Sequence, residues 1–255
     1  MEKKLKSLLE EMGSVLVAFS GGIDSTYLLD VATEVLGPEK AVGVFLDGMF
    51  QREEERRRVL ALGEERGFTL RILPMEELPE EVLRNPKDRC YRCKSFLFQS
   101  LQSLAGAEGR VLVDGTHAED DPKERPGMKA LEELSVRSPL REVGMTKAMI
   151  REAAKARNIS SWDLPSDACL ATRVATGQRL TSEELGRIEE AESILHDLGF
   201  SLCRVRLAGR NARIEVAPSE LERLFSMREE VLTLLLPLGF SRVSLDLEGY
   251  GRRKG

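Results

Sequence analysis

The first half of the chain alternates short apolar runs with longer amphipathic segments. Four apolar runs have the length of strands and lie over 14–19, 41–47, 68–73 and 110–114. Helical patterns precede, separate or follow them over 3–12, 27–36, 51–66, 76–83 and 90–104. Continuous apolar runs are typical of parallel strands covered on both faces, joined by right-handed crossovers. The pattern therefore predicts an α/β fold with an open parallel sheet, whose ligands bind outside the carboxyl ends of the strands.

The pattern changes towards the second half of the chain. Segment 122–137 contains two prolines and predicts a loop with a short helix, whereas Thr146 is a suitable cap for a following helix. Beyond a linker around 162–169, helix and strand patterns succeed one another over 181–198, 201–207, 212–217, 218–235 and 240–247. Gly209-Arg210-Asn211 separates two alternating segments and indicates a hairpin. We expect two domains, over 1–165 and 166–255, the second being a small α+β layer.

Composition narrows the class of protein. The 255 residues are 42% hydrophobic and 32% charged, which favours one sizeable core under a charged surface. The formal net charge of -5 argues against a general nucleic-acid binder. No apolar run reaches the roughly 18 residues of a membrane span, and the first residues do not resemble a secretory signal. We expect a cytoplasmic protein with no membrane partner and no stable nucleic-acid partner.

A glycine-rich turn, Ser20-Gly21-Gly22-Ile23-Asp24-Ser25, joins the first apolar run to a helical pattern. Backbone N–H groups at such a turn and helix start bind phosphate, and glycines let the backbone approach an anion directly. Ser20 and Ser25 add hydroxyl donors, and Asp24 can hold Mg²⁺ or orient the loop. The spacing fits neither a Walker A motif nor the dinucleotide fingerprint. The plain alternative is a strand-to-helix turn with a serine cap.

This hexapeptide after a hydrophobic strand resembles the PP-loop of the ATP pyrophosphatases. Those enzymes cleave ATP between the α and β phosphates and adenylate a substrate, so the resemblance implies ATP and Mg²⁺. Two other turns, Asp47-Gly48-Met49 and Asp114-Gly115-Thr116, follow predicted strands that end at the same sheet edge. The residues predicted to bind the nucleotide are Ser20, Gly21, Gly22, Asp24, Ser25, Asp47, Met49, Gly115 and Thr116.

Four further polar residues are secondary candidates for this site. Lys94 and Lys147 are predicted as additional phosphate contacts, with solvated surface lysine as the alternative. Asp120 and Asp121 either bind magnesium or simply begin a loop.

Cys90 and Cys93 form a C-x-x-C motif, and Cys169 lies far along the chain. The motif has three readings: a redox dithiol, half of a zinc site, or part of an iron–sulfur site. A closed zinc site would have to recruit His117, His196 or Cys203, and Cys203 suits a buried thiol in a strand. Three cysteines without a fourth are what a cluster with one open iron requires, while incidental buried thiols are the alternative.

A wider resemblance rests on three segments, 88–94, 114–116 and 165–173, and extends from about residue 10 to Tyr250. Together they resemble the LarE family, ATP-dependent sulfur transferases of nickel-pincer nucleotide biosynthesis. The resemblance implies that a carboxylate of pyridinium-3,5-biscarboxylic acid mononucleotide is adenylated and then converted to a thiocarboxylate. It also implies a PP-loop domain over 1–165 and a substrate, sulfur-transfer and oligomerisation domain over 166–255.

Members of that family differ in their source of sulfur. Some donate the sulfur of a single cysteine in an Ala-Cys-Leu segment, where Cys169 stands here, and retain dehydroalanine. Others also carry the C-x-x-C motif and hold a 4Fe-4S cluster on three cysteines, with an extra sulfide on the open iron. This sequence has all three cysteines and is closer to the second type. The resemblance thus implies Cys90, Cys93 and Cys169 as catalytic cluster ligands, a sulfide or persulfide donor, and a homo-oligomer.

Arginines are the candidate ligands for the phosphate and second carboxylate of the substrate, because the guanidinium fork matches both anions. Arg204 and Arg206 share one face of their strand by alternation. Salt bridges to Glu189, Glu192 or Glu215 are the alternative. The predicted substrate ligands are Arg173, Arg204, Arg206 and Arg213.

Three other functions compete with this interpretation. A PP-loop tRNA thiolation enzyme also pairs cysteines with a cluster, but the acidic balance disfavours it. A partner resembling NAD synthetase leaves the cysteines unexplained. A nucleotide-binding iron–sulfur regulatory or storage protein predicts ATP binding without release of pyrophosphate.

Overall fold

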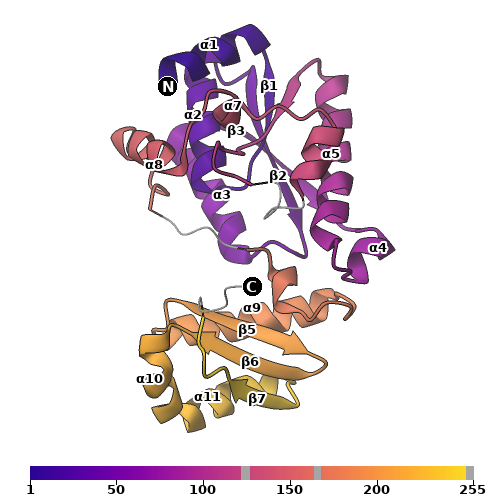
Figure 1. Ribbon diagram of the computed structural model, residues 1–255, viewed down its shortest axis with the longest axis vertical. Coiled ribbons are helices and arrows are strands. Elements are labelled where there is room, and N and C mark those ends of the chain that lie inside the picture. Colours follow the sequence, from indigo (N-terminus) through magenta and orange to yellow (C-terminus); the bar gives the residue numbers. More distant parts are fainter. Residues whose placement is uncertain (122–126, 164–167, 251–255) are drawn as a thin grey trace. The chain divides into compact units, whose positions relative to one another are not determined.

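The computed structural model describes residues 1–121, 127–163 and 168–250, and the chain divides into two compact units (Figure 1). The first unit comprises Met1–Val82 and Asp88–Asp167, and the second comprises Leu83–Lys87 and Ala168–Gly255. The short segment joins the second unit because Leu180 N donates to Leu83 O (2.7 Å) and the Asn85 amide donates to Ala175 O (3.0 Å). Parts of the predicted loop 122–137 and of the linker 162–169 lie outside the described residues.

Four parallel strands form the sheet of the first unit, in the order β3-β2-β1-β4. They are β1 (Val15–Ala18), β2 (Ala41–Gly48), β3 (Thr69–Met75) and β4 (Val111–Val113). Val15 pairs with Ala41 on one side and with Val111 on the other, so β1 is central. The predicted α/β fold with an open parallel sheet is confirmed.

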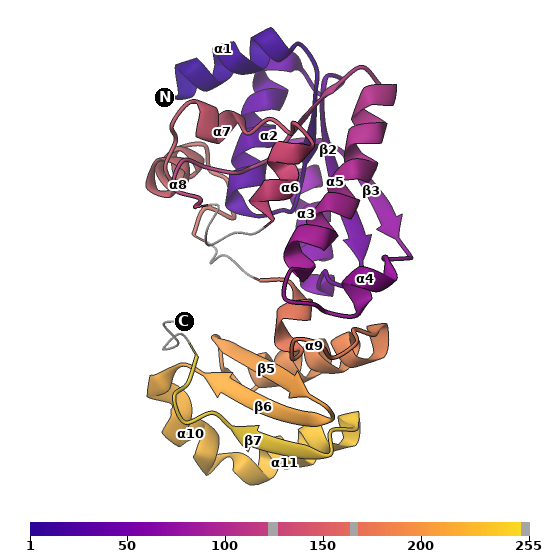
Figure 2. The ribbon, with the colours of Figure 1, turned by 45° about the vertical axis from the view of Figure 1, so that its right-hand side comes forward.

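Helices cover both faces of this sheet (Figure 2). One face carries α1 (Glu2–Met12), α2 (Ile23–Leu36), α3 (Glu53–Arg66) and α8 (Lys147–Ala156), and the other carries α5 (Arg89–Ala107) and α6 (Met128–Glu133). Val15 and Val17 pack with the first group and Leu16 with the second, and all three are fully buried. Each such side chain stabilises the fold by about 2 kcal/mol, which explains the unbroken apolar run.

Local signals set the element ends. Gly37 and Gly67 follow α2 and α3 with φ of 83° and 64°, a region that glycine adopts without strain. Thr146 Oγ1 accepts a hydrogen bond from Met149 N (3.3 Å), which confirms the predicted cap of α8. The short helix α7 (Pro139–Glu142) was not predicted; it begins with a proline at its first position.

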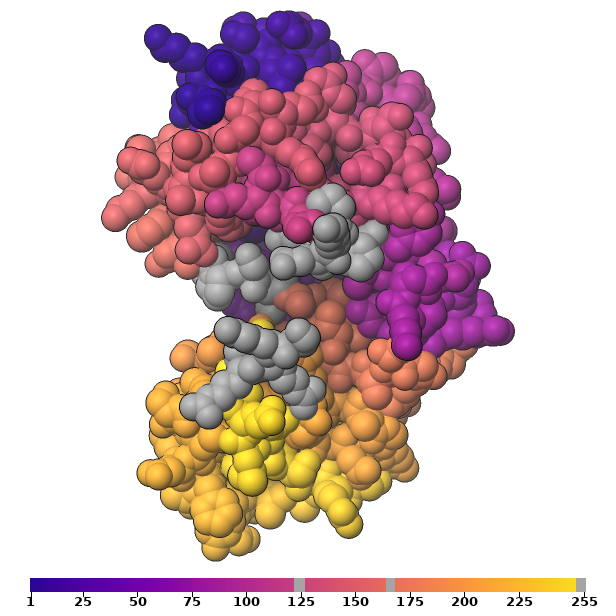
Figure 3. Space-filling view, viewed as in Figure 1, coloured from indigo at the N-terminus to yellow at the C-terminus, as the bar shows by residue number. Residues whose placement is uncertain are grey.

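The predicted helix over 76–83 is wrong in its first half. The chain forms only α4 (Glu80–Leu83), because β3 continues to Met75 and Pro79 follows four residues later. Proline fits the start of a helix but not its interior, and here Pro79 O accepts the first turn's bond from Val82 N (2.8 Å). In the space-filling view, α4 and the start of α5 (purple) lie at the surface of the first unit (Figure 3).

The second unit is a three-stranded sheet with helices, ordered β5-β6-β7. Its elements include the 3-10 helix η1 (Leu170–Arg173), α9 (Ser182–Asp197), β5 (Cys203–Ala208), β6 (Asn211–Val216) and β7 (Arg242–Leu245). β5 and β6 are antiparallel across Gly209-Arg210, which confirms the hairpin, and β7 runs parallel to β6. Helices α9 and α11 (Arg228–Leu235) contact each other, and α9 contacts β5.

The predicted helix over 218–235 is broken. The chain instead forms the 3-10 turn η2 (Pro218–Glu220), α10 (Leu221–Ser226) and α11, followed by the turn η3 (Leu236–Leu238). At the break, the Ser226 hydroxyl donates to Arg223 O (2.7 Å), and Met227 N donates to Arg223 O and Leu224 O. Such side-chain bonds compete with the helical ladder. No helix within the described parts of the chain is long and apolar enough to cross a membrane.

A buried carboxylate ties three helices of the first unit together. Asp30 on α2 accepts hydrogen bonds from Arg66 Nε (3.0 Å) on α3 and from Arg157 Nε (2.5 Å), the residue that follows α8. Arg157 also contacts Glu34 (2.5 Å). Burial by itself lowers the pKa of Arg157, but its bonds with Glu34 and Asp30 outweigh this and raise that pKa above the usual value. The guanidinium therefore stays charged and holds α8 against α2.

The substitution Asp30→Asn is expected to lower the free energy of unfolding by about 2–3 kcal/mol. It keeps the shape of the side chain but removes the carboxylate that pairs with the largely buried Arg66, and it leaves Arg157 to pair with Glu2 and Glu34. Guanidinium chloride unfolding followed by circular dichroism measures the loss. Glu53→Gln, which removes the exposed partner of Arg57, is the control and should change stability by less than about 0.5 kcal/mol. An equally small effect of Asp30→Asn would contradict the role given to the carboxylate.

Candidate functional site

The loop Ser20–Ser25 leaves the central strand β1 and is closed by its own serines. Ser20 N and Ser20 Oγ both lie 3.2 Å from Ser25 Oγ, which donates to Gly22 O (3.1 Å). Gly21 has a φ of 69°, and a Cβ there would lie 2.8 Å from the Val59 side chain. The loop therefore requires glycine at this position both for its conformation and for its packing against α3.

The start of α2 is arranged to receive an anion. Gly22 is the N-cap residue, and no side chain in the described parts of the chain caps the helix. The first N–H groups of a helix lack intrahelical partners, and the helix dipole favours negative charge there. The 14-residue helix after a glycine turn therefore has the backbone donors that the predicted phosphate site requires, and phosphate binding itself stays a prediction.

The turn after β4 presses directly on this loop. A Cβ built on Gly115 would lie 2.9 Å from Ser25 N and 3.2 Å from the Asp24 carbonyl carbon. Asp114 holds the turn in place, since it accepts hydrogen bonds from Ser138 Oγ (2.6 Å) and from the Thr116 hydroxyl. Gly115 is therefore part of the loop's support, and the Thr116 hydroxyl is directed to Asp114.

Two predicted ligands meet at the helix start. Lys147 Nζ on α8 lies 2.6 Å from Asp24 Oδ2, and Lys147 N donates to Glu119 Oε2 (2.7 Å). The other oxygen, Asp24 Oδ1, is buried and has no hydrogen-bond partner among the described residues. A buried carboxylate oxygen without a partner is a suitable magnesium ligand, and Mg²⁺ held between phosphates needs only one or two protein carboxylates. The donor chemistry at Asp24 therefore fits Mg²⁺.

The remaining predicted nucleotide ligands contact other neighbours. Asp47 Oδ2 lies 3.2 Å from Arg56 Nε, and Lys94 Nζ lies 5.9 Å from the centre of the Phe98 ring. Met49 lines a small apolar pocket after β2 together with Leu46, Phe50, Met75 and Leu97. Their roles toward a nucleotide stay predictions. Asp120 is buried and accepts a hydrogen bond from His117 N (3.0 Å), so it stabilises the turn after β4.

Cys90 and Cys93 lie three residues apart near the start of α5, so they share one face of the helix. Cys90 is exposed and Cys93 half-buried. Cys169 is exposed and precedes η1 in the second unit, whereas Cys203 is fully buried, as its strand position predicted. Within the residues that the structure describes, no three His, Cys, Asp or Glu side chains are grouped around one metal position. Two accessible thiols on one turn and a third on another segment suit cluster ligation chemically, and their convergence stays a prediction.

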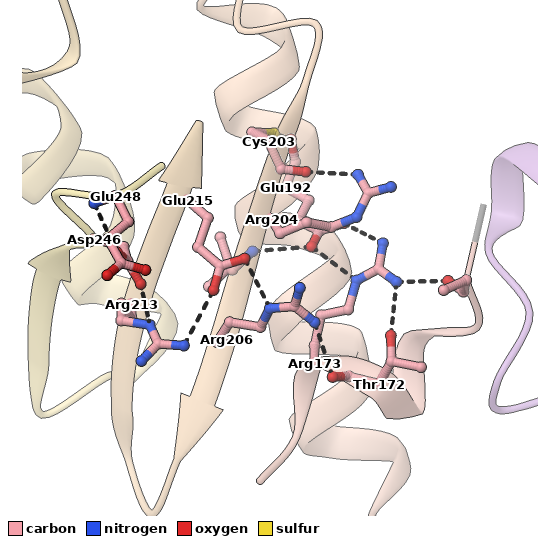
Figure 4. A network of polar contacts seen from close by, with 12 residues as sticks. Thr172, Arg173, Glu192, Cys203, Arg204, Arg206, Arg213, Glu215, Asp246 and Glu248 are labelled. Carbon is pink, nitrogen blue, oxygen red and sulfur yellow. Dashed lines mark hydrogen bonds and ion pairs between the residues drawn. The ribbon is translucent and has the colours of Figure 1, made fainter. Parts of the chain in front are cut away.

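Two of the predicted substrate arginines, Arg206 and Arg213, form ion pairs on one face of the second unit's sheet (Figure 4). Glu215 lies between Arg206 Nε (3.0 Å) and Arg213 Nη2 (3.1 Å), and Arg213 Nε lies 3.2 Å from Asp246 Oδ2. Arg204 Nη1 donates to Cys203 O (2.7 Å). The salt bridges to Glu215 that were named as the alternative are therefore present for Arg206 and Arg213, although both side chains retain exposed surface with which to meet an anion.

Arg173 differs from the other three because its side chain is fully buried. It pairs with Glu192, and its remaining nitrogen donates to the carbonyl oxygens of Ala168 (2.5 Å) and Cys169 (3.3 Å) (Figure 4). This placement favours a supporting role for Arg173 over the predicted contact with substrate.

Glu119, Ser138 and Asp246 take part in these arrangements but were not predicted from the sequence. Each meets its partner from a different element, at a separation of 24 residues for Ser138 and 28 for Glu119. Neither separation is a helix or strand period, so no local pattern marked these residues.

Comparison with known proteins relates nearly the whole chain to others. The NAD synthase family matches residues 1–92. An uncharacterized protein of Synechocystis sp. is 36% identical over 258 residues, 98% of this chain and 96% of the relative. The pyridinium-3,5-bisthiocarboxylic acid mononucleotide synthase of Lactiplantibacillus plantarum is 32% identical over 248 residues, 96% of this chain and 90% of the relative. An uncharacterized protein of Methanocaldococcus jannaschii is 29% identical over 251 residues, 97% and 96% of the two chains.

Gly115→Ala is expected to weaken binding of an ATP analogue with Mg²⁺ about tenfold, or about 1.4 kcal/mol. The added Cβ would lie 2.9 Å from Ser25 N, and backbone atoms cannot move away by changing rotamer as a side chain can. Calorimetric titration measures the affinity. Gly106→Ala is the matched control, because a Cβ on this helical glycine meets nothing within 4 Å. Equal affinities for the two variants would show that the Gly115 contact does not shape the nucleotide site.

Proposed function

This chain belongs to the LarE-like family of the PP-loop and NAD synthase superfamily, and we propose that it uses ATP to insert sulfur into pyridinium-3,5-biscarboxylic acid mononucleotide. The observation that carries the proposal is the 32% identity across 90% of a bisthiocarboxylic acid mononucleotide synthase. The family resemblance predicted from the motifs is thereby confirmed. The substrate, the source of sulfur and the roles of individual residues belong to the proposal.

The first proposed step is adenylation of a substrate carboxylate. A carboxylate oxygen attacks the α phosphorus of ATP, the bond from that phosphorus to the bridging oxygen breaks, and pyrophosphate leaves. Backbone N–H groups at the start of α2 and the hydroxyls of Ser20 and Ser25 would stabilise the leaving phosphates. Asp24 would hold Mg²⁺, which neutralises phosphate charge when bound. Lys147, which contacts Asp24 at 2.6 Å, would turn to the phosphates or keep Asp24 in place.

The second proposed step replaces the activated oxygen by sulfur. A sulfide sulfur attacks the acyl carbon, the bond from that carbon to the bridging oxygen breaks, and AMP leaves with the oxygen. Arg204, Arg206 and Arg213 are proposed to bind the substrate phosphate and its second carboxylate, because their guanidinium groups gather on one sheet face. Two rounds convert both carboxylates, which agrees with the bisthiocarboxylate named for the relative.

For the sulfur source we propose a 4Fe-4S cluster on Cys90, Cys93 and Cys169. The two accessible thiols on one turn of α5 support this choice, since a chain that used Cys169 alone would not need them. When bound, the cluster would carry an additional sulfide on its open iron, and an external sulfide or persulfide donor would replace it after each transfer. The family membership also supports a homo-oligomer.

We expect the anaerobically reconstituted protein to form AMP, pyrophosphate and thiocarboxylate when given MgATP, sulfide and the biscarboxylate mononucleotide. Product mass and nucleotide analysis measure all three. Unmodified tRNA in place of the mononucleotide is the control substrate. AMP formation with tRNA but not with the mononucleotide would replace the proposal by a tRNA thiolation enzyme. Binding of ATP without pyrophosphate under either condition would instead favour a regulatory protein.

Replacing either Cys90 or Cys93 by serine is expected to remove the bound iron and repeated sulfur transfer, while pyrophosphate release with the mononucleotide persists. Cys203→Ala is the matched control, because this thiol is buried in β5 and should not affect iron content. Iron analysis and turnover number measure the effects. Unchanged iron in the two serine variants, together with loss of hydrogen sulfide from the Cys169 peptide after one turnover, would identify Cys169 as a sacrificial donor.

A further inference from the structure

A fully buried arginine lies beneath the segment that carries Cys169. Arg173 Nε donates to Glu192 Oε1 (3.1 Å) and its Nη2 donates to Glu192 Oε2 (3.3 Å), so the two groups form a two-bond fork. Both side chains are at most 1% exposed. A buried ion pair adds little net stability relative to apolar residues of the same volume, because both charges lose their hydration. Net stability therefore does not explain why an ion pair is buried here.

The far edge of the same guanidinium holds two carbonyl groups. Arg173 Nη1 donates to Ala168 O (2.5 Å) and Cys169 O (3.3 Å), the carbonyls on either side of the Cys169 backbone N–H and side chain. Thr172 adds to this, since its hydroxyl (2.8 Å) and its N–H (3.0 Å) both donate to Cys169 O. These donors of Arg173 and Thr172 form what we call the carbonyl clasp. It fixes the backbone on both sides of the Cys169 Cα, while the residue itself remains exposed.

The clasp is anchored to the core of the second unit. Glu192 lies on α9, and its Oε1 also accepts a hydrogen bond from Val205 N (2.9 Å) on β5. Leu170 and Ala171, between the cysteine and the clasp residues, are buried. Figure 4 shows the Arg173 guanidinium between Glu192 on one side and the Thr172 segment on the other. Hydrogen bonds thus anchor the backbone of Cys169 to α9 and β5, although the residue lies at the surface.

We propose that the Arg173–Glu192 pair and Thr172 are positioning residues that hold Cys169 in the orientation required for sulfur transfer. This inference rests on the proposed function, because it assigns the clasp to the second half-reaction. Only arginine has donors on several edges of one rigid plane, so it can fork Glu192 and reach two carbonyls at once; lysine cannot. Alignment of reacting groups contributes strongly to rate, and displacement by about 1 Å can cost about 100-fold.

The test compares the two half-reactions in Arg173→Lys and Thr172→Val. Thr172→Val retains the shape of the side chain at a partly exposed position and removes the hydroxyl, so it tests the clasp even if the first variant folds poorly. We expect mononucleotide-dependent pyrophosphate release to stay within about twofold of wild type, with an unchanged KM. Formation of thiocarboxylate should fall about tenfold or more in each variant.

Arg223→Lys is the matched control. Arg223 also donates to backbone carbonyls of the second unit, at Leu198 and Gly199, but not to the Cys169 segment. This variant should keep both half-reactions, even where it lowers the melting temperature. Hydrogen exchange gives a readout that needs no substrate. The backbone N–H of residue 172, which is bonded to Cys169 O, should exchange about tenfold faster than wild type in Thr172→Val. In Arg223→Lys its exchange rate should equal that of wild type.

Three results would overturn the inference. A parallel fall of both half-reactions would indicate general loss of folded protein, and a raised KM for the mononucleotide would indicate that Arg173 contacts substrate. Unchanged hydrogen exchange at residue 172, together with unchanged formation of thiocarboxylate, would show that the carbonyl clasp does not position Cys169. Failure of the proposed function would give a different result, because wild-type protein would then release no pyrophosphate with the mononucleotide. The hydrogen-exchange comparison would still show whether the carbonyl clasp orders the segment around Cys169.

Discussion

The close approach of the turn after β4 to the start of α2 governs the arrangement of the first unit's candidate site. At Gly115 the backbone lies so near Ser25 N that even a methyl group would collide with it. This contact exists because β1 lies between β2 and β4 in a parallel sheet, so that their carboxyl ends emerge side by side. The glycine loop after β1 and the Asp114 turn after β4 therefore lie side by side, and α8 brings Lys147 to Asp24 beside them. The order of the strands fixes where the candidate site lies, and the residues of the loop supply the groups that would bind a ligand.

Buried charge serves two different ends in the two units. In the first unit, Asp30 joins α2 to α3 and to the end of α8, the helix that begins with Lys147, so the ion network supports the site indirectly. In the second, the Arg173–Glu192 pair directs unused donors toward the Cys169 backbone. The first arrangement can be judged by stability alone. The second is judged by hydrogen exchange at residue 172 and by one step of the reaction, because breaking the buried pair also destabilises the fold and stability alone cannot separate the two effects.

Much of the fold was readable from the sequence because burial on both faces of a parallel sheet leaves a clear signature. Residues 41–47 and 14–19 are nearly all apolar, and both became central strands. The features that the sequence did not predict also have physical causes. The apolar pattern of 218–235 continues through Met227, so it could not reveal a break that depends on a Ser226 side-chain bond. Lys147 and Asp24 are 123 residues apart, and Arg157 and Asp30 are 127 apart. Charge pairs of this kind follow from tertiary packing, which no local period records.

Adenylation of the carboxylate is tested by following the oxygen atom that sulfur replaces. If the loop Ser20–Ser25 activates a carboxylate by adenylation, the oxygen bridging carbon and phosphorus must leave with AMP. With the mononucleotide labelled with ¹⁸O in both carboxylates, mass analysis of the AMP formed in a single turnover should find one ¹⁸O atom in its phosphate. AMP without the label, formed at the same rate in the presence of the mononucleotide, would mean that water and not the carboxylate attacks ATP. That result would exclude adenylation of the substrate carboxylate.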